Sequence, residues 1–183
     1  MELKKRGHNL PVYFGNRNWH PFASETAEKM SQDGVRKVAV FATSAWGGYS
    51  ACRQYDEDIQ QMREHLAEQG LPDIEFTKIR QFFDHPKFVV EMAAAVTEVW
   101  GQVPEEKKES TRMLFTAHSV PVAHDNVGGV EGDKNLYSRQ VAEASRLVAS
   151  QAGISDYDLV WQSRSGNPRT CLLYTSPSPR DQR

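Results

Sequence analysis

Short apolar runs alternate with stretches of helical periodicity along this chain, and this alternation limits the fold more than any other sequence feature. The runs have the length of strands and are mostly continuous in apolar character, as is typical of strands covered on both faces. They lie at residues 10–14, 38–42, 74–79, 113–117 and 159–161. Strands separated by helices must run parallel with right-handed crossovers, so we predict a doubly wound α/β fold.

Apolar side chains recur at helical spacing between these runs and predict the helices. The three clearest stripes are Tyr55, Ile59, Met62 and Leu66; Phe88, Met92, Val96 and Val99; and Tyr137, Val141, Ala144 and Val148. A residue without Cβ adopts the left-handed conformation at least cost, so glycines are expected to end the helices. The candidates are Gly34, Gly70, Gly101 and Gly153.

Residues 80–86 (RQFFDHP) mark the predicted domain boundary. Pro86 restrains the residue before it and suits the first turn of a helix. We assign residues 1–83 to the latter part of one α/β domain and residues 84–170 to the first part of a second. Residues 171–183 lack periodicity and resemble the translation of a DNA-library adapter, so we interpret them as a non-native tail. The chain is therefore expected to be an internal fragment with both domains incomplete.

Composition limits the classes of function. The chain has 39% hydrophobic and 25% charged residues and no apolar run of membrane length, which favours a globular protein. Its net charge of -2 argues against binding to nucleic acid. Two cysteines, Cys52 and Cys171, cannot form a disulfide framework, and no apolar segment follows the basic start. We therefore expect a cytoplasmic protein.

Ligands of open α/β sheets gather at the carboxyl ends of the strands, so the residues that follow three of the strands are candidates for a site. Residues 43–50 (TSAWGGYS) combine hydroxyls with glycines before a helix, a pattern that can hold a carboxylate or phosphate. A simple helix cap and loop accounts for the same residues. No glycine-rich nucleotide motif is present.

His118 leaves the fourth strand at this edge. A neutral imidazole can accept a proton or bind a divalent cation near neutral pH, although a hydrogen-bonded structural histidine is the alternative. Ser119 lacks the sequence context of a nucleophile, and His124 lacks helical spacing for a metal pair. The remaining candidates for caps or surface positions are His20, His65 and His85.

The last strand runs into a polar turn that contains Gln162, Ser163 and Arg164. These residues form either an ordinary βα loop or a wall of the same cleft, because all three strand ends belong to one edge of the sheet.

Five segments resemble, in order and with fitting spacing, the ferrochelatase family, and most closely its actinobacterial coproporphyrin-type branch. The segments are VYFGNRNWHPF, FATSAWGGYSACRQY, DHPKFV, LFTAHSVP and WQSRSGNPRT, and the resemblance covers nearly all of residues 10–170. It implies two Rossmann-like chelatase domains around a porphyrin cleft. It also implies a metal-inserting lyase that places Fe²⁺ in coproporphyrin III or protoporphyrin IX during haem biosynthesis.

The resemblance further implies roles for individual residues. His118 is similar to the active-site histidine that binds the incoming iron and accepts the pyrrole protons. Tyr55 matches a tyrosine that contacts a substrate propionate. The residues similar to those that line the cleft are Thr43, Ser44, Trp46, Gln162 and Ser163. Porphyrin and Fe²⁺ are the implied partners, Fe²⁺ being a substrate, and no tightly bound cofactor is predicted.

Some features of the family have no match in this sequence. The glutamate that completes the metal site and the tryptophan of the PWL motif would follow Thr170, and the loop over the porphyrin would precede Met1. We therefore expect the chain alone to be inactive and poorly soluble. An iron–sulfur cluster, as in some actinobacterial relatives, and peripheral membrane contact stay open.

The sequence leaves open two alternatives to an iron chelatase. The first is a chelatase for another metal or tetrapyrrole, and the sequences TAHSVP and WQS favour the iron branch over it. The second is a non-catalytic carrier of a tetrapyrrole or metal. A carrier needs no basic histidine above the ring, so it explains His118 less well.

Overall fold

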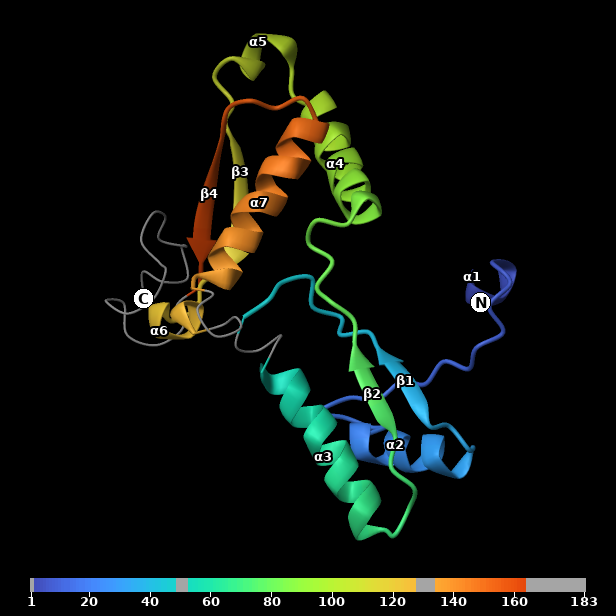
Figure 1. Cartoon of the computed structure of the whole chain (residues 1–183). Coiled ribbons are helices and arrows are strands. Elements are labelled where there is room, and N and C mark those ends of the chain that lie inside the picture. Colours follow the sequence, from blue (N-terminus) through green and yellow to red (C-terminus); the bar gives the residue numbers. More distant parts are fainter. Residues whose placement is uncertain (1, 49–52, 128–133, 164–183) are drawn as a thin grey trace. The chain divides into compact units, whose positions relative to one another are not determined.

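A computed structural model of the chain describes residues 2–48, 53–127 and 134–163 (Figure 1). The chain divides into two compact units. The first comprises Met1–Phe41 and Gln54–Ile79, and the second comprises Ala42–Arg53 and Arg80–Arg183. The loop after the first strand therefore groups with the second unit. The predicted tail at 171–183 lies outside the described residues.

The first unit is a strand–helix–strand unit preceded by two helices. Its elements are α1 (Glu2–Lys5), α2 (Ala23–Gln32), β1 (Lys37–Val40), α3 (Gln54–Glu68) and β2 (Glu75–Lys78). Strands β1 and β2 pair in parallel, with Lys37 opposite Glu75. Helices α2 and α3 supply most of the core, which consists of Ala27, Met30, Met62, Leu66 and Ile74.

The second unit repeats this arrangement with longer elements. They are α4 (Pro86–Gly101), α5 (Glu105–Lys108), β3 (Met113–His118), α6 (Val122–Asn126), α7 (Leu136–Gln151) and β4 (Tyr157–Gln162). Strands β3 and β4 also pair in parallel. Figure 1 shows α7 alongside the two strands and α4 next to α7. Val89 and Ala93 of α4 pack with Val148 of α7 and with Phe115 of β3.

The predicted α/β class and four of the five predicted strands are confirmed. The segment 10–14 is not a strand, and that prediction is wrong. Pro11 has no N–H to donate to a ladder, and Val12 and Phe14 are exposed. This segment is instead held by side chains, because the Tyr13 hydroxyl donates to Asp33 and Thr26 Oγ1 donates to the Phe14 carbonyl.

The strands are not covered on both faces in the described part of the chain, contrary to the prediction. Exposed and half-buried residues alternate along β1, β2 and β3, as in strands that pack on one face. On β3, Phe115 and Ala117 lie on the packed side, whereas Thr116 and His118 are exposed.

Two of the three predicted helix stripes are confirmed. Helix α3 buries Met62 and Leu66, and α7 buries Val141, Ala144 and Val148. The stripe predicted for α4 is half right, because Phe88 and Val96 are half-buried, whereas Met92 and Val99 are exposed. The fully buried residues of this helix are Val89 and Ala93. The sequence FVVEMAAAV is apolar on two adjacent stripes, so its periodicity does not determine which one faces α7.

The predicted helix ends agree with the structure at all but one position. Gly34, Gly70 and Gly153 have positive φ after α2, α3 and α7. Gly101 is still helical, and Gln102 caps α4 in a right-handed conformation. At the other end of α4, His85 Nδ1 accepts a hydrogen bond from the Lys87 N–H and Pro86 opens the first turn, as predicted.

Candidate active site

His118 and Gln162 are the last residues of two adjacent parallel strands. They lie opposite each other in the register of β3 and β4. The N–H of Ser119 continues the ladder by donating to the Gln162 carbonyl at 2.8 Å. Ser163 follows with a left-handed φ of 64°, so the extended conformation of β4 ends at Gln162. The structure therefore brings three predicted residues, His118, Gln162 and Ser163, to one edge of the sheet.

The imidazole of His118 has one engaged nitrogen. Nδ1 lies 2.7 Å from the carbonyl oxygen of Ser119. A carbonyl can only accept, so Nδ1 carries the proton and the lone pair of a neutral ring lies on Nε2. His118 is exposed, and no residue in the described ranges hydrogen-bonds Nε2. This nitrogen is chemically able to accept a proton or to bind a metal ion.

Tyr137, in the first turn of α7, contacts the same strand ends and was not among the predicted site residues. Its hydroxyl donates to the carbonyl of His118 at 2.9 Å. Its ring centre lies 5.8 Å from that of Trp161 on β4. Burial raises the pKa of Tyr137, and the nearby Asp125 carboxylate adds to this effect. The available signal was a tyrosine at the start of the apolar stripe that predicted this helix.

Asp125 fixes the start of α7. It is 2% exposed, and its carboxylate accepts from the Ser138 N–H at 3.1 Å and from Ser138 Oγ at 2.6 Å. The carbonyl of Asp125 accepts from the N–H of Asn135, which has a left-handed φ of 57°. A carboxylate on the free N–H groups of a first helical turn is a favourable arrangement. Asp125 therefore determines where Tyr137 sits relative to α6.

The loop at residues 42–48 is attached to the same turns of α7. The Gly47 N–H donates to the Gln140 side-chain oxygen. A Cβ on Gly47 would lie 2.6 Å from Leu136 Cδ2, and one on Gly48 would lie 3.4 Å from Tyr137 Cβ. Leu136 leaves no room for a Cβ on Gly47, whereas at Gly48 the backbone itself favours glycine, because its φ of 139° is one that other residues rarely adopt.

This loop contains three predicted site residues, Thr43, Ser44 and Trp46. The Ser44 hydroxyl donates to the Trp46 carbonyl at 3.2 Å, and the Trp46 ring meets Phe88 of α4 edge to face at 6.2 Å. Thr43 is exposed. Residues 49 and 50 of the predicted anion-binding segment, and Arg164 of the last predicted turn, lie outside the described residues.

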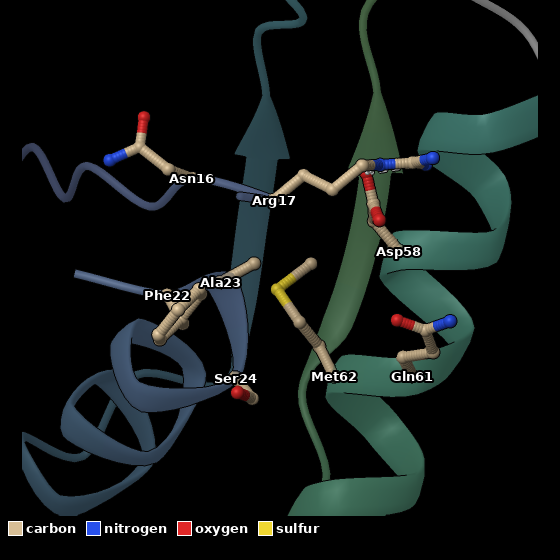
Figure 2. Close-up of a pocket in the computed structure, with 8 residues that line it drawn as sticks. All are labelled: Asn16, Arg17, Phe22, Ala23, Ser24, Asp58, Gln61 and Met62. Carbon is tan, nitrogen blue, oxygen red and sulfur yellow. Dashed lines mark hydrogen bonds and ion pairs between the residues drawn. The ribbon is translucent and has the colours of Figure 1, made fainter. Parts of the chain in front are cut away.

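Tyr55 belongs to the first unit, where it is half-buried in the first turn of α3. Arg17 lies in the loop before α2 and attaches that loop to the first turn of α3. Its guanidinium donates to the Gln54 carbonyl and pairs with Asp58 at 3.0 Å (Figure 2). Arg17 was also missed, because its partners are a backbone carbonyl and a carboxylate 41 positions away.

Two cavities of the first unit contain none of the predicted site residues. The one in Figure 2 lies beside Arg17 and measures about 110 Å³, whereas small-molecule sites occupy about 300–1,000 Å³. The other measures about 400 Å³ and lies beside Arg36 and Glu75, at the amino ends of β1 and β2. Ligands of such sheets bind at the opposite, carboxyl ends. Neither cavity is therefore a candidate for the predicted site.

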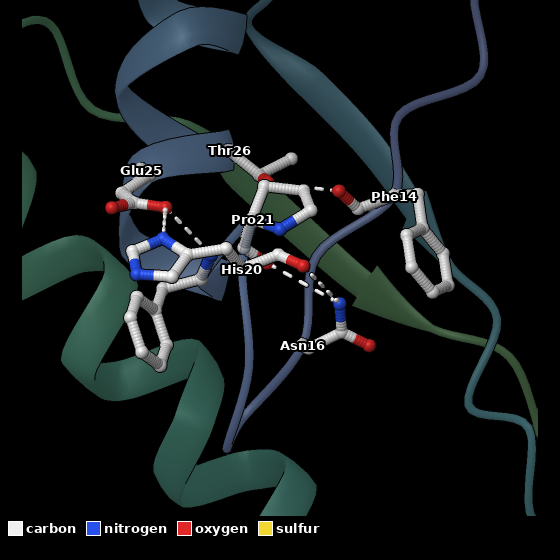
Figure 3. Close-up of polar contacts among 7 residues, drawn as sticks. Phe14, Asn16, His20, Pro21, Glu25 and Thr26 are labelled. Carbon is white, nitrogen blue, oxygen red and sulfur yellow. Dashed lines mark hydrogen bonds and ion pairs between the residues drawn. The ribbon is translucent and has the colours of Figure 1, made fainter.

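The segment NRNWHPF closes a compact loop in front of α2 (Figure 3). Asn16 Nδ2 donates to the carbonyls of His20 and Pro21 at 3.4 and 3.5 Å. The Glu25 carboxylate accepts from the Phe22 N–H at 2.7 Å, and this hydrogen bond holds the pKa of Glu25 below its usual value. His20 pairs with the same carboxylate, so it is a surface residue beside a helix cap, as predicted.

The described ranges contain neither a cluster of metal ligands nor a membrane-spanning helix. Three or more histidine, cysteine, aspartate or glutamate side chains do not gather there in a way that could hold a metal ion. No described helix has the length and apolar character needed to cross a membrane.

Comparison with known proteins agrees with the resemblance seen in the motifs. The ferrochelatase family model matches residues 1–171. The chain is 57% identical over 172 residues to the coproporphyrin III ferrochelatase of Corynebacterium glutamicum, covering 94% of the chain and 46% of that protein. The proteins of the same name from Corynebacterium diphtheriae and Mycolicibacterium smegmatis are 58% and 52% identical. These matches cover 90% and 94% of the chain, and 46% and 48% of the relatives.

The chain thus spans about half the length of the curated relatives it matches. The family model, in contrast, extends over nearly the whole chain. The chain belongs to the ferrochelatase family.

Proposed function

We propose that the full-length protein, meaning a chain of the relatives' length that contains this sequence, inserts Fe²⁺ into coproporphyrin III in haem biosynthesis. The names of the relatives support this substrate. The observation that carries the proposal is the exposed His118 at the carboxyl edge of β3, with Nε2 as its proton-free nitrogen. We also propose that residues 1–83 and 84–170 belong to the two chelatase domains of the family.

The reaction requires a base. A free-base porphyrin carries two pyrrole N–H protons, and Fe²⁺ can occupy the ring centre only when both leave. In the balanced reaction, the free-base porphyrin and Fe²⁺ give the iron porphyrin and two H⁺. His118 Nε2 accepts a pyrrole proton and, because the side chain is exposed, releases it to water before it accepts the second.

The same nitrogen serves as a ligand for the incoming iron. Nδ1 is occupied by the Ser119 carbonyl, so His118 has one lone pair for both tasks. Fe²⁺ must therefore move from Nε2 to the two unprotonated nitrogens on the face of the porphyrin before Nε2 takes a proton, and it enters the ring centre once both pyrrole protons have left. Imidazole suits this transfer, because it binds Fe²⁺ without the tenacity of a thiolate.

The other predicted residues bind and orient the porphyrin in this proposal. The Tyr55 hydroxyl donates a hydrogen bond to a propionate, which is rich in acceptors. Thr43, Ser44 and Trp46 line one side of the ring, and Gln162 and Ser163 line the other. The scheme uses no tightly bound cofactor. We assign it to the cytoplasm, where a reducing environment keeps iron ferrous.

Anaerobic metallation by the full-length protein tests this function. Fe²⁺ is added to the protein with either coproporphyrin III or protoporphyrin IX, and the loss of the free-base absorption spectrum is followed. We expect rapid metallation of coproporphyrin III and slower metallation of protoporphyrin IX. Binding of both porphyrins without faster metallation than in buffer would contradict the proposal and favour a carrier.

A further inference from the structure

We propose that Tyr137 is a positioning residue that, through the backbone carbonyl of His118, keeps the imidazole proton on Nδ1 and the lone pair on Nε2. This inference rests on the function proposed for His118, since it explains how the acceptor nitrogen is selected. Tyr137 acts through another residue and has no assigned contact with substrate.

The peptide group between His118 and Ser119 is held from both sides. Its carbonyl accepts from the Tyr137 hydroxyl at 2.9 Å, and its N–H donates to the Gln162 carbonyl at 2.8 Å. The two partners come from α7 and β4, which are separate elements of the second unit. With both ends of the group bonded, the plane of this peptide is fixed.

The next carbonyl determines the tautomer. Ser119 O lies 2.7 Å from His118 Nδ1. Ser119 contributes its N–H to the 118–119 peptide and its carbonyl to the next peptide. The orientation of the first peptide therefore influences the position of this carbonyl. If the 118–119 peptide rotates, this carbonyl moves away from Nδ1, and the proton is free to occupy either nitrogen. The carbonyl of His118 lies at the end of β3, and the Tyr137 hydroxyl is the donor that the structure gives it.

Tyr137 is itself immobilised by its neighbours. Its ring packs against Trp161, and Gly48 approaches it so closely that a Cβ there would be in van der Waals contact. Asp125 anchors the adjacent Ser138 through two hydrogen bonds. The hydroxyl is therefore presented from a rigid element, which is what a positioning residue requires.

Nitrogen-15 NMR of the full-length protein, labelled at histidine, measures the tautomer directly. The spectrum is recorded at a pH at which the imidazoles are neutral, and His118→Gln assigns the His118 signal by its loss. We expect the unmodified protein to show protonated Nδ1 and unprotonated Nε2. The opposite tautomer in this protein would overturn the proposal without any variant.

Tyr137→Phe keeps the ring and removes only the donor. The matched control is Tyr157→Phe, because Tyr157 lies at the other end of β4 with its ring against Phe115. We expect Tyr137→Phe to give a mixture of tautomers and to lower kcat for metallation about tenfold, with the KM for porphyrin unchanged. Tyr157→Phe should retain the Nδ1–H tautomer and the wild-type kcat.

The two readouts separate this inference from the function of His118. A pure Nδ1–H tautomer in Tyr137→Phe would refute the positioning role, even with iron insertion intact. A mixed tautomer in Tyr137→Phe would support the role, even in a protein that metallates nothing. A fall in thermal stability with no change of tautomer would show that Tyr137 contributes only to packing, and would also refute the proposal.

Discussion

Gly47 lies in the loop at residues 42–48, at a point where a side chain has no room. Replacement by alanine places a Cβ 2.6 Å from Leu136 Cδ2 and 3.1 Å from the Gln140 oxygen that accepts its own N–H. Relief of this overlap requires Leu136 or the loop to shift, so we expect Gly47→Ala to destabilise the protein by about 1–3 kcal/mol. Thermal or denaturant unfolding measures the change.

Gly101→Ala is the control for Gly47→Ala. Gly101 lies at the end of α4, and a Cβ there would meet nothing within 4 Å. We expect this change to be neutral or stabilising, because alanine has the higher helix propensity. Equal losses for the two variants would contradict the packing described for the loop.

Tyr55→Phe tests the proposed propionate contact. Loss of one hydrogen bond from a hydroxyl should weaken binding of coproporphyrin III by about 1 kcal/mol, or roughly fivefold in Kd. Fluorescence titration of the full-length protein with porphyrin measures the affinity, and Tyr157→Phe serves as the unaffected comparison. An unchanged Kd for Tyr55→Phe would remove this residue from the site.

The residues predicted from motifs and those found only in the structure differ in how they act. His118, Gln162 and Ser163 were predicted because they follow strands, and parallel strands bring their carboxyl ends to one edge. Tyr137 and Asp125 act on backbone groups of other elements. Such bonds depend on where a helix begins, and neither periodicity nor a motif specifies that position.

At the scale of elements, the sequence predicted the buried faces of two helices and the glycines that end three helices. Helices α3 and α7 have single apolar stripes, so their buried faces followed from spacing. Helix α4 has two such stripes, and contact with α7 decides between them. The segment 10–14 has the apolar character of a strand but includes Pro11, and it pairs with no strand among the described residues.

Arg112 joins the starts of β3 and β4. Its guanidinium is bonded in two places to Asp158 and contacts Asp156 at 2.7 Å. The hydrogen bond from Arg112 holds the pKa of Asp158 below its usual 3.8. A lowered carboxyl pKa stabilises the folded state above the unfolded pKa, and this contribution is lost as the pH falls through the folded pKa.

We therefore expect Arg112→Ala to lower the Tm at neutral pH, and the difference from wild type to close as the pH drops below 3.8. Arg146→Ala is the control, because Arg146 pairs with Glu143 inside α7 and joins no two elements. Its effect should be smaller at neutral pH. Thermal unfolding monitored by circular dichroism across this range measures both. A pH-independent effect of Arg112→Ala would contradict the role of the ion pair.

At the scale of the whole molecule, each unit is a parallel strand–helix–strand unit with its own hydrophobic core. The proposed roles are divided between them. Tyr55 in the first unit is assigned to porphyrin binding, and His118 in the second is assigned to iron and proton transfer. This division predicts that binding and metallation can be impaired separately by single substitutions.

Single-turnover metallation by His118→Ala tests the central claim most directly. Coproporphyrin III is bound first to the full-length protein, its affinity is measured, and Fe²⁺ is then added without oxygen. We expect His118→Ala to bind the porphyrin with near-normal affinity and to insert iron slower by about 10²–10⁴-fold, as loss of a general base implies. His124→Ala, which removes the next histidine along the chain, should metallate at the wild-type rate. Wild-type metallation by His118→Ala would contradict the account.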